Sequence, residues 1–308
     1  MLCTNSADLS NSMIPLAGIL IVFAAVIGGF VMESGPMAEL AQPAEILIII
    51  GAALGSVMVA NPPAQVAKTA HAILAVFRRS TYTSERYLST LVMLSSVFHF
   101  VRRHDARALE NAVEDPSASP LFSRHETEIS PEVVEFVCDT LRLTSLATIS
   151  GFSMDEMLEN DLETRRAAAA VPSEILARLA DSLPGFGIVA AVLGVILSMG
   201  AMHDAPQLLG MKIASALIGT FTGILLAYGV VSPLSDRLAK IEHAESEYFD
   251  SIRAALSSFS RGMPVAIAVE CARRAIPEDI RPDFNLAEQR CREADHAMHA
   301  QPALSARA

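Results

Sequence analysis

The chain has 308 residues, of which 52% are hydrophobic and 6% aromatic, and its formal net charge is -11. Soluble domains of this length are seldom so apolar, so the composition indicates an integral membrane protein. The negative charge excludes a nucleic-acid-binding role, because a protein that binds phosphates needs a basic surface.

Four apolar segments are long enough to cross a membrane, which takes roughly 20 mostly apolar residues. The first two cover residues 13–32 and 44–60, and the other two cover residues 185–202 and 214–231. The last two contain no Asp, Glu, Lys, Arg or His. None of the four has the polar face of a buried helix in a soluble bundle, so the sequence predicts membrane spans.

The positions of lysine and arginine predict the orientation, because these residues are retained on the cytoplasmic side of a membrane. The chain has none before Lys68, several in the polar region that follows, and more after the last span, from Arg237. Both polar regions and both termini are therefore expected in the cytoplasm, with the connections 33–43 and 203–211 outside. The N-terminus lacks the basic start of a cleavable signal peptide, which favours a retained first span.

The predicted fold class is all-α: an integral membrane protein with four transmembrane helices and a helical cytoplasmic domain. In the polar regions apolar residues recur at helical spacing, as at Leu88, Leu91 and Val92. The final stretch has little to bury, so we expect a mobile tail there. The expected divisions are a leader (1–12), a first transmembrane pair (13–60), a cytoplasmic helical domain (61–181), a pore-lining second pair (182–233), C-terminal cytoplasmic helices (234–284) and the tail (285–308).

The polar region between the spans gives no indication of an enzyme or a cofactor. It has no glycine-rich phosphate loop, no zinc-ligand spacing and no nucleophile elbow. Cys3, Cys138, Cys271 and Cys291 show no paired spacing, and their predicted places keep thiols reduced. We therefore expect structural or incidental cysteines, no metal, no cofactor and no catalytic residue.

The two central spans carry hydroxyl groups but no acid. A hydroxyl can bond a neighbouring helix or a hydrated ion, or a backbone carbonyl one turn earlier in its own helix. An intramembrane carboxylate costs on the order of 3 kcal/mol and usually marks an ion path, so its absence argues against a self-contained proton relay. The sequence instead predicts a single-span partner that brings an aspartate. The hydroxyl groups belong to Ser198, Ser215, Thr220, Thr222 and Tyr228.

Small residues at four-residue spacing let helices approach closely, and three such pairs favour a tightly packed oligomer. Pro184 and Pro233 stand at the ends of the central spans, which suits either helix punctuation or a hinge. Arg102 and Glu110 lie eight residues apart in a charged helical region, near one face after about two turns. By themselves they indicate solvated surface. The small pairs are Gly51 with Gly55, Ala190 with Gly194, and Gly219 with Gly223.

Three blocks of sequence around the central spans are distinctive. They are residues 181–194 (DSLPGFGIVAAVLG), 216–229 (ALIGTFTGILLAYG) and 232–234 (SPL). Together with residues 42–51 and 264–270 they closely resemble the flagellar stator A subunit family, MotA. The likeness runs from about residue 13 to residue 284.

In that family, five A subunits surround two B subunits (MotB), whose single helices carry the proton-binding aspartate. Cytoplasmic charges on the A subunit engage the rotor protein FliG. The resemblance therefore implies a homopentameric, proton-conducting stator subunit in the bacterial inner membrane. It implies a rotor contact at Arg102, Glu110 and Asp161, conformational coupling at Pro184 and Pro233, and an ion path lined by Thr220, Tyr228 and Ala190.

Three alternatives remain beside this expectation. A motor subunit like ExbB or TolQ, which energises outer-membrane processes, usually has three spans rather than four. A solute transporter working alone would show an intramembrane charge or interrupted helices around a midplane site. Sodium could replace the proton, but Ala190 and Ala191 stand where sodium-driven relatives tend to carry a threonine.

Overall fold

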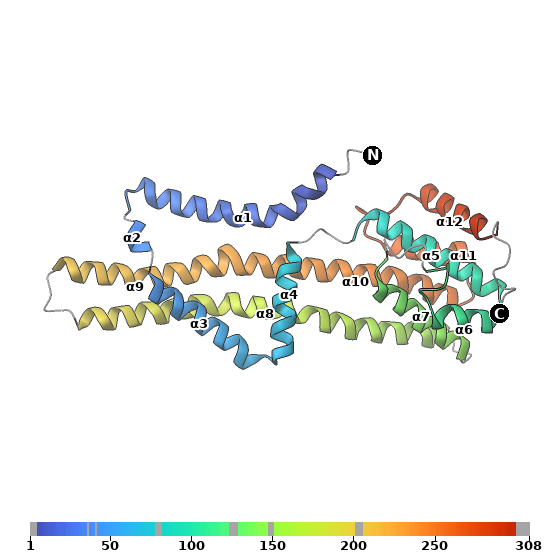
Figure 1. The fold of residues 1–308 in the computed structure, drawn as a ribbon, viewed down its shortest axis with the longest axis horizontal. Coiled ribbons are helices and arrows are strands. Elements are labelled where there is room, and N and C mark those ends of the chain that lie inside the picture. The colour runs from blue at the N-terminus through green and yellow to red at the C-terminus, as the bar shows by residue number, and fades with distance from the viewer. Residues whose placement is uncertain are drawn as a thin grey trace. The chain divides into compact units, whose positions relative to one another are not determined.

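The computed structural model describes residues 5–35, 37–40, 42–77, 82–122, 129–146, 151–200 and 206–299. Within these ranges every regular element is a helix (Figure 1), which confirms the all-α prediction. In chain order these are α1 (Asn5–Met32), α2 (Met37–Leu40), α3 (Pro43–Ala60), α4 (Pro63–Val76), α5 (Ser84–Arg103), α6 (Ala106–Glu114), α7 (Pro131–Leu146), α8 (Gly151–Met199), α9 (Pro206–Leu226), the π-helix η2 (Ala227–Val231), α10 (Ser232–Ser260), α11 (Val265–Ala275) and α12 (Phe284–His299).

The chain folds into two compact units, each made of two separate stretches of sequence. The membrane unit comprises Met1–Ser80 and Ala167–Glu242, and the polar unit comprises Thr81–Arg166 and His243–Ala308. Two helices, α8 and α10, contribute residues to both units. Each of these helices therefore runs without a break from one unit into the other.

Four helices are long and apolar enough to cross a membrane, as the sequence predicts. Two of them cover Ile14–Met32 and Pro43–Ala60. The other two are much longer than a span, with 49 residues in Gly151–Met199 and 51 residues in Gly210–Ser260. The apolar segments expected at 185–202 and 214–231 are therefore parts of helices that continue into polar sequence.

Proline does not end either long helix. Pro172 and Pro184 both lie inside α8, and Pro233 is the second residue of α10. A helical proline donates no backbone hydrogen bond, and its ring conflicts with the carbonyl four residues earlier. For Pro233 that carbonyl belongs to Gly229, which lies in the π-helix, where the hydrogen bonds skip one residue further. The local change of helix type lets the chain continue past the proline.

The helices α8 and α9 touch backbone to backbone through glycines. A Cβ atom added to Gly223 would lie 2.7 Å from the carbonyl oxygen of Leu183, and one added to Gly187 would lie 2.8 Å from that of Gly219. A Cβ on Gly194 would meet the Cβ of Ala216 at 2.8 Å. Two of the three predicted small pairs therefore pack these helices within one chain.

The remaining pair, Gly51 with Gly55, is open. A Cβ added to either glycine would have no atom within 4 Å among the described residues. This part of α3 is available for lipid or for another subunit. Its neighbours in sequence, Leu47, Leu54 and Met58, are exposed large apolar residues, which need such a cover.

The core of the polar unit combines aliphatic side chains with several aromatic rings. Phe98 of α5 stacks on Phe259 of α10, with ring centroids 4.2 Å apart. The buried hydroxyls of Thr90 and Tyr248 lie 2.5 Å from each other, which satisfies both groups inside the core. The polar unit therefore has a buried core of its own.

The end of the chain differs from the prediction. The expected mobile tail began at residue 285, but α12 runs to His299, and its residues Ala287 and Cys291 pack against the core of the polar unit. The thiol of Cys291 lies 3.9 Å from the carbonyl oxygen of Leu91 in α5. Ala287 and Cys291 lie four residues apart, so they fall on the same face of α12, a pattern that overall composition conceals. Residues 300–308 lie outside the described ranges.

A matched pair of substitutions tests the glycine contact. Gly187→Ala should lower the thermal stability of the purified, detergent-solubilised chain, because the new Cβ meets the Gly219 carbonyl and overpacking costs about 1–3 kcal/mol. Gly185→Ala, two residues away in the same helix, adds a Cβ that meets no atom within 4 Å. It should leave the midpoint of thermal unfolding unchanged or raise it. Equal losses for both variants would contradict the close approach.

Candidate functional site

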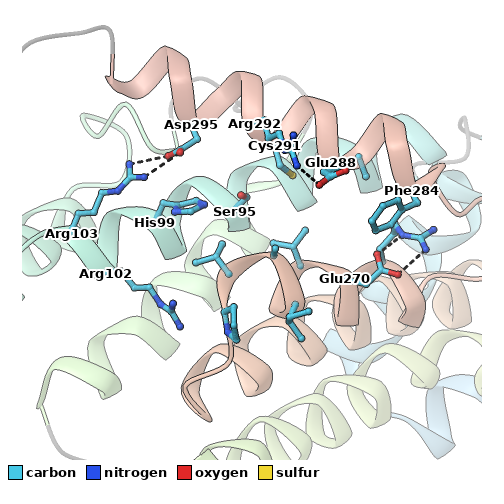
Figure 2. A pocket seen from close by; sticks show the side chains of 17 residues that line it. Ser95, His99, Arg102, Arg103, Glu270, Phe284, Glu288, Cys291, Arg292 and Asp295 are labelled. Carbon is cyan, nitrogen blue, oxygen red and sulfur yellow. Dashed lines mark hydrogen bonds and ion pairs between the residues drawn. The ribbon is translucent and has the colours of Figure 1, made fainter.

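The side chain of Arg102 is tied to the turn between α10 and α11. It leaves the last turn of α5, and its Nη2 donates to the carbonyl oxygens of Gly262 at 3.3 Å and Met263 at 2.6 Å. Its guanidinium group also lies over the Phe259 ring, 5.6 Å from the centroid. The side chain is exposed, yet these contacts hold it in one direction (Figure 2).

Glycine is needed at the turn that Arg102 contacts. Gly262 has a φ of 82°, in the left-handed region that other residues avoid. Its N–H donates to the carbonyl of Phe259, and the next N–H, from Met263, donates to that of Ser258. These two backbone hydrogen bonds form the Schellman motif, which satisfies the last carbonyls of a helix. The direction of Arg102 therefore depends on how α10 ends.

A pocket of about 700 Å³ opens beside Arg102, between α5, α11 and α12 (Figure 2). Its floor is apolar, and acids on its rim are paired with arginines. Three pairs surround it: Arg103–Asp295 at 3.0 Å, Arg273–Glu270 at 2.7 Å and Arg292–Glu288 at 2.6 Å.

The chemistry of this pocket is that of a contact surface. Hydrogen bonds from Arg273 hold the pKa of Glu270 below its usual value, so this carboxylate stays charged at neutral pH. Burial raises the pKa of the Cys291 thiol to about 11, which keeps it protonated and unreactive. Paired acids and a protonated thiol suit packing against another surface rather than acid–base or nucleophilic catalysis.

The other two predicted rotor residues are also exposed in the polar unit. Glu110 lies on α6 and is exposed, whereas Leu109 and Val113 of the same helix are buried. Asp161 lies on α8 and forms an ion pair with Arg165 at 3.4 Å. Both side chains are exposed, and exposed ion pairs contribute little to stability.

Arg102 and Glu110 do not share a helix, so the expectation that both lie on one face is wrong. The helix α5 ends at Arg103, and α6 begins at Ala106. His104 and Asp105 between them have extended backbone angles and cap the two helices. Spacing by eight residues predicts a common face only where no such break intervenes.

In the membrane unit, the predicted ion-path residues differ in exposure. Tyr228, in the π-helix, is 66% exposed, whereas Ala190 is buried in the cluster that α3, α8 and η2 form. Thr220 is half-buried, and its Cα lies at the α8 contact, 3.3 Å from a Cβ added to Gly187. Pro184 is half-buried inside α8, and Pro233 is exposed.

Sequence reasoning missed one acidic residue in the membrane unit. Glu45 lies in the first turn of α3, and its side chain is buried. The hydroxyl of Ser215 on α9 donates to the Glu45 carboxyl at 3.1 Å, whereas the hydroxyl of Ser198 donates to the backbone carbonyl of Val195 in its own helix. A carboxylate inside a predicted span is itself the signal that could have revealed it.

The chain matches known families over most of its length. Residues 16–105 match the motility protein A N-terminal family, and residues 134–251 match the MotA/TolQ/ExbB proton channel family. Motility protein A of Escherichia coli is 36% identical over 281 residues, covering 91% of this chain and 95% of the relative. Chemotaxis protein LafT of Vibrio parahaemolyticus is 33% identical over 273 residues, covering 88% and 96%.

Solved structures have the same fold. A chain of the C. jejuni MotAB structure matches with a TM-score of 0.71 at 19% identity, covering 88% of this chain and 99% of that one. A chain of the flagellar MotAB stator complex from Bacillus subtilis matches with a TM-score of 0.66 at 22% identity, covering 93% and 98%. By its sequence over nearly its whole length, the chain belongs to the motility protein A (MotA) family.

Proposed function

We propose that the chain is the A subunit of a proton-driven stator of the bacterial flagellar motor, which converts ion flow into torque on the rotor. The observation that carries this proposal is the 36% identity to a motility protein A across 91% of the chain. The ExbB/TolQ alternative shares only the channel family, whereas residues 16–105 match a family particular to motility protein A. The four candidate spans also favour the flagellar role.

The membrane unit supports an assembly of several copies around a B subunit of the MotB type. Large apolar side chains on α8 and α9 are exposed in the single chain and require cover from lipid or neighbouring subunits. They include Ile188, Val192, Ile196, Leu217 and Ile224. Because the central spans hold no acid, the proton-binding aspartate is assigned to the partner's single span.

Within that assembly, Thr220 and Tyr228 line the ion path. Ala190 is buried against Gly219, where it keeps α8 and α9 close enough to form the wall. Pro184 and Pro233 act as the sites of conformational coupling. Each interrupts the hydrogen bonding of a helix that contributes to both units, so a bend at a spanning segment changes the helix direction beyond it.

The exposed charges of the polar unit face the rotor. Arg102, Glu110 and Asp161 engage the rotor protein FliG, and the protein lies in the bacterial inner membrane with both termini in the cytoplasm. Support comes from their exposure and from the absence of lysine and arginine before Lys68.

Charge reversal tests the rotor contact. In a strain whose only stator contains this chain, Arg102→Glu should reduce swimming to a small fraction of normal without reducing the amount of protein in the membrane. Arg103→Glu is the matched control, because Arg103 already pairs with Asp295 and its reversal should have the smaller effect. Swimming at normal speed with Arg102→Glu would count against the assignment.

A second control separates the rotor contact from the turn that Arg102 holds. Gly262→Ala strains the same turn by about 1 kcal/mol and leaves every charge in place. It should spare most of the swimming. If it impairs swimming as much as Arg102→Glu does, the role of Arg102 is to position the turn.

A proton-flux measurement tests whether the chain needs the B subunit to conduct protons. In proteoliposomes with a pH-sensitive dye, the chain alone should carry no proton current under an imposed voltage. Co-reconstitution with a MotB-type subunit should produce one, since the partner supplies the missing acid. A current through the chain alone would show that the central spans do not need a borrowed aspartate.

A further inference from the structure

The carboxyl group of Glu45 is the most unusual polar group in the membrane unit. The residue is only 7% exposed, although it lies in a helix of apolar sequence. Its Oε1 accepts a hydrogen bond from the Ser215 hydroxyl, and its Oε2 is buried with no hydrogen-bond partner in the described part of the chain. A buried polar atom without a partner is rare enough in proteins to require an explanation.

The surface of α9 is shaped to receive this carboxyl group. Ser215 supplies the one donor, and Gly219, one turn later on the same face, has no side chain to fill the space. A Cβ atom added to Gly219 would lie 3.0 Å from Oε2. Any larger residue at this position would crowd the carboxyl group. The Ser215 hydroxyl and the space beside Gly219 together form a pocket that fits the carboxyl group.

Among the described residues, no ion pair joins Glu45 to a positive charge. On α9, Lys212 is the nearest ionisable residue in sequence, one turn before Ser215. The helix α8 carries no ionisable residue after Asp181. Lys68 and His71 on α4 follow the other end of α3, whose 18 residues span about 27 Å.

Binding of a proton would remove the unpaired buried charge on Glu45. An ionised carboxylate buried without a counter-charge is costly, whereas burial of the neutral carboxyl group costs much less. Uptake of one proton on Oε2 removes the charge and leaves Oε1 free to accept from Ser215. The reaction is a simple protonation, with no co-reactant and no change in any other bond.

We propose that Glu45 is a proton-binding site of the membrane unit, distinct from the aspartate expected from the partner, and that Ser215 and Gly219 form its pocket. The proton is exchanged where α3 meets α9, so the charge on this carboxyl group governs how closely the two helices fit. Neither the rotor nor proton flow is needed for the binding itself. The inference rests on the proposed function only for the partner subunit used in its test, and a failed swimming or proton-flux experiment would leave it standing.

Infrared difference spectroscopy tests the site directly. The full chain, purified with its MotB-type partner in lipid nanodiscs, is compared at acidic and alkaline pH. A carbonyl stretching band of a protonated carboxyl group should appear at acidic pH, be lost in Glu45→Gln and shift in frequency in Ser215→Ala, which removes the hydrogen bond to Oε1. Glu33→Gln, at an exposed acid beyond the end of α1, is the matched control and should leave the band unchanged.

Each outcome decides the question. Identical difference spectra for the original chain and Glu45→Gln would overturn the proposal, as would a band that changes with sodium concentration at constant pH, since this would indicate a metal cation. If Glu45→Gln fails to assemble, as judged by its elution volume, the Ser215→Ala spectrum decides instead. An unshifted band in that variant would show that the protonated group lies elsewhere.

Discussion

The membrane unit depends on the contact between the backbones of α8 and α9. The carbonyl oxygens of Leu183 and Gly219 occupy the places where side chains would stand on Gly223 and Gly187. In lipid there is no hydrophobic gain from pairing two apolar helices, so van der Waals contact at this distance is the main attraction. The same contact places Gly223 beside the carbonyl that precedes Pro184.

The polar unit is held by different forces. Its core is a cluster of aromatic and aliphatic side chains, and its surface carries a network of ion pairs. Arg253 binds Asp155 at 3.1 Å, and Arg261 reaches the same carboxylate at 2.7 Å. Shared pairs of this kind hold the first turns of α8 to the last turns of α10. One long helix thus uses ionic contacts near its start and glycine contacts further along.

The spans and the fold class could be predicted from the sequence, because membrane thickness sets a minimum apolar length that four segments meet. Reasoning from neighbouring residues was not enough where a side chain depends on another segment of the chain. The sequence left Pro233 open as helix punctuation or as a hinge, and only the structure shows the π-helix that lets the helix continue past it. Glu45 stood at the edge of an apolar segment, and only the partner helix shows that it is buried. The Arg102 contacts depend on a turn 160 residues away in the chain.

The π-helix has a consequence for the angular positions of side chains. A five-residue turn holds about one residue more than an α-helical turn, and each residue advances the helix by about 100°. The faces of α9 and α10 are therefore offset by about that angle from those of an uninterrupted α-helix. With this offset, Leu238 packs in one buried cluster with Val76 and Leu176. Loss of a single residue from the π-helix would rotate α10 about its own axis relative to α9. This short segment therefore sets the angle between the faces of the two helices.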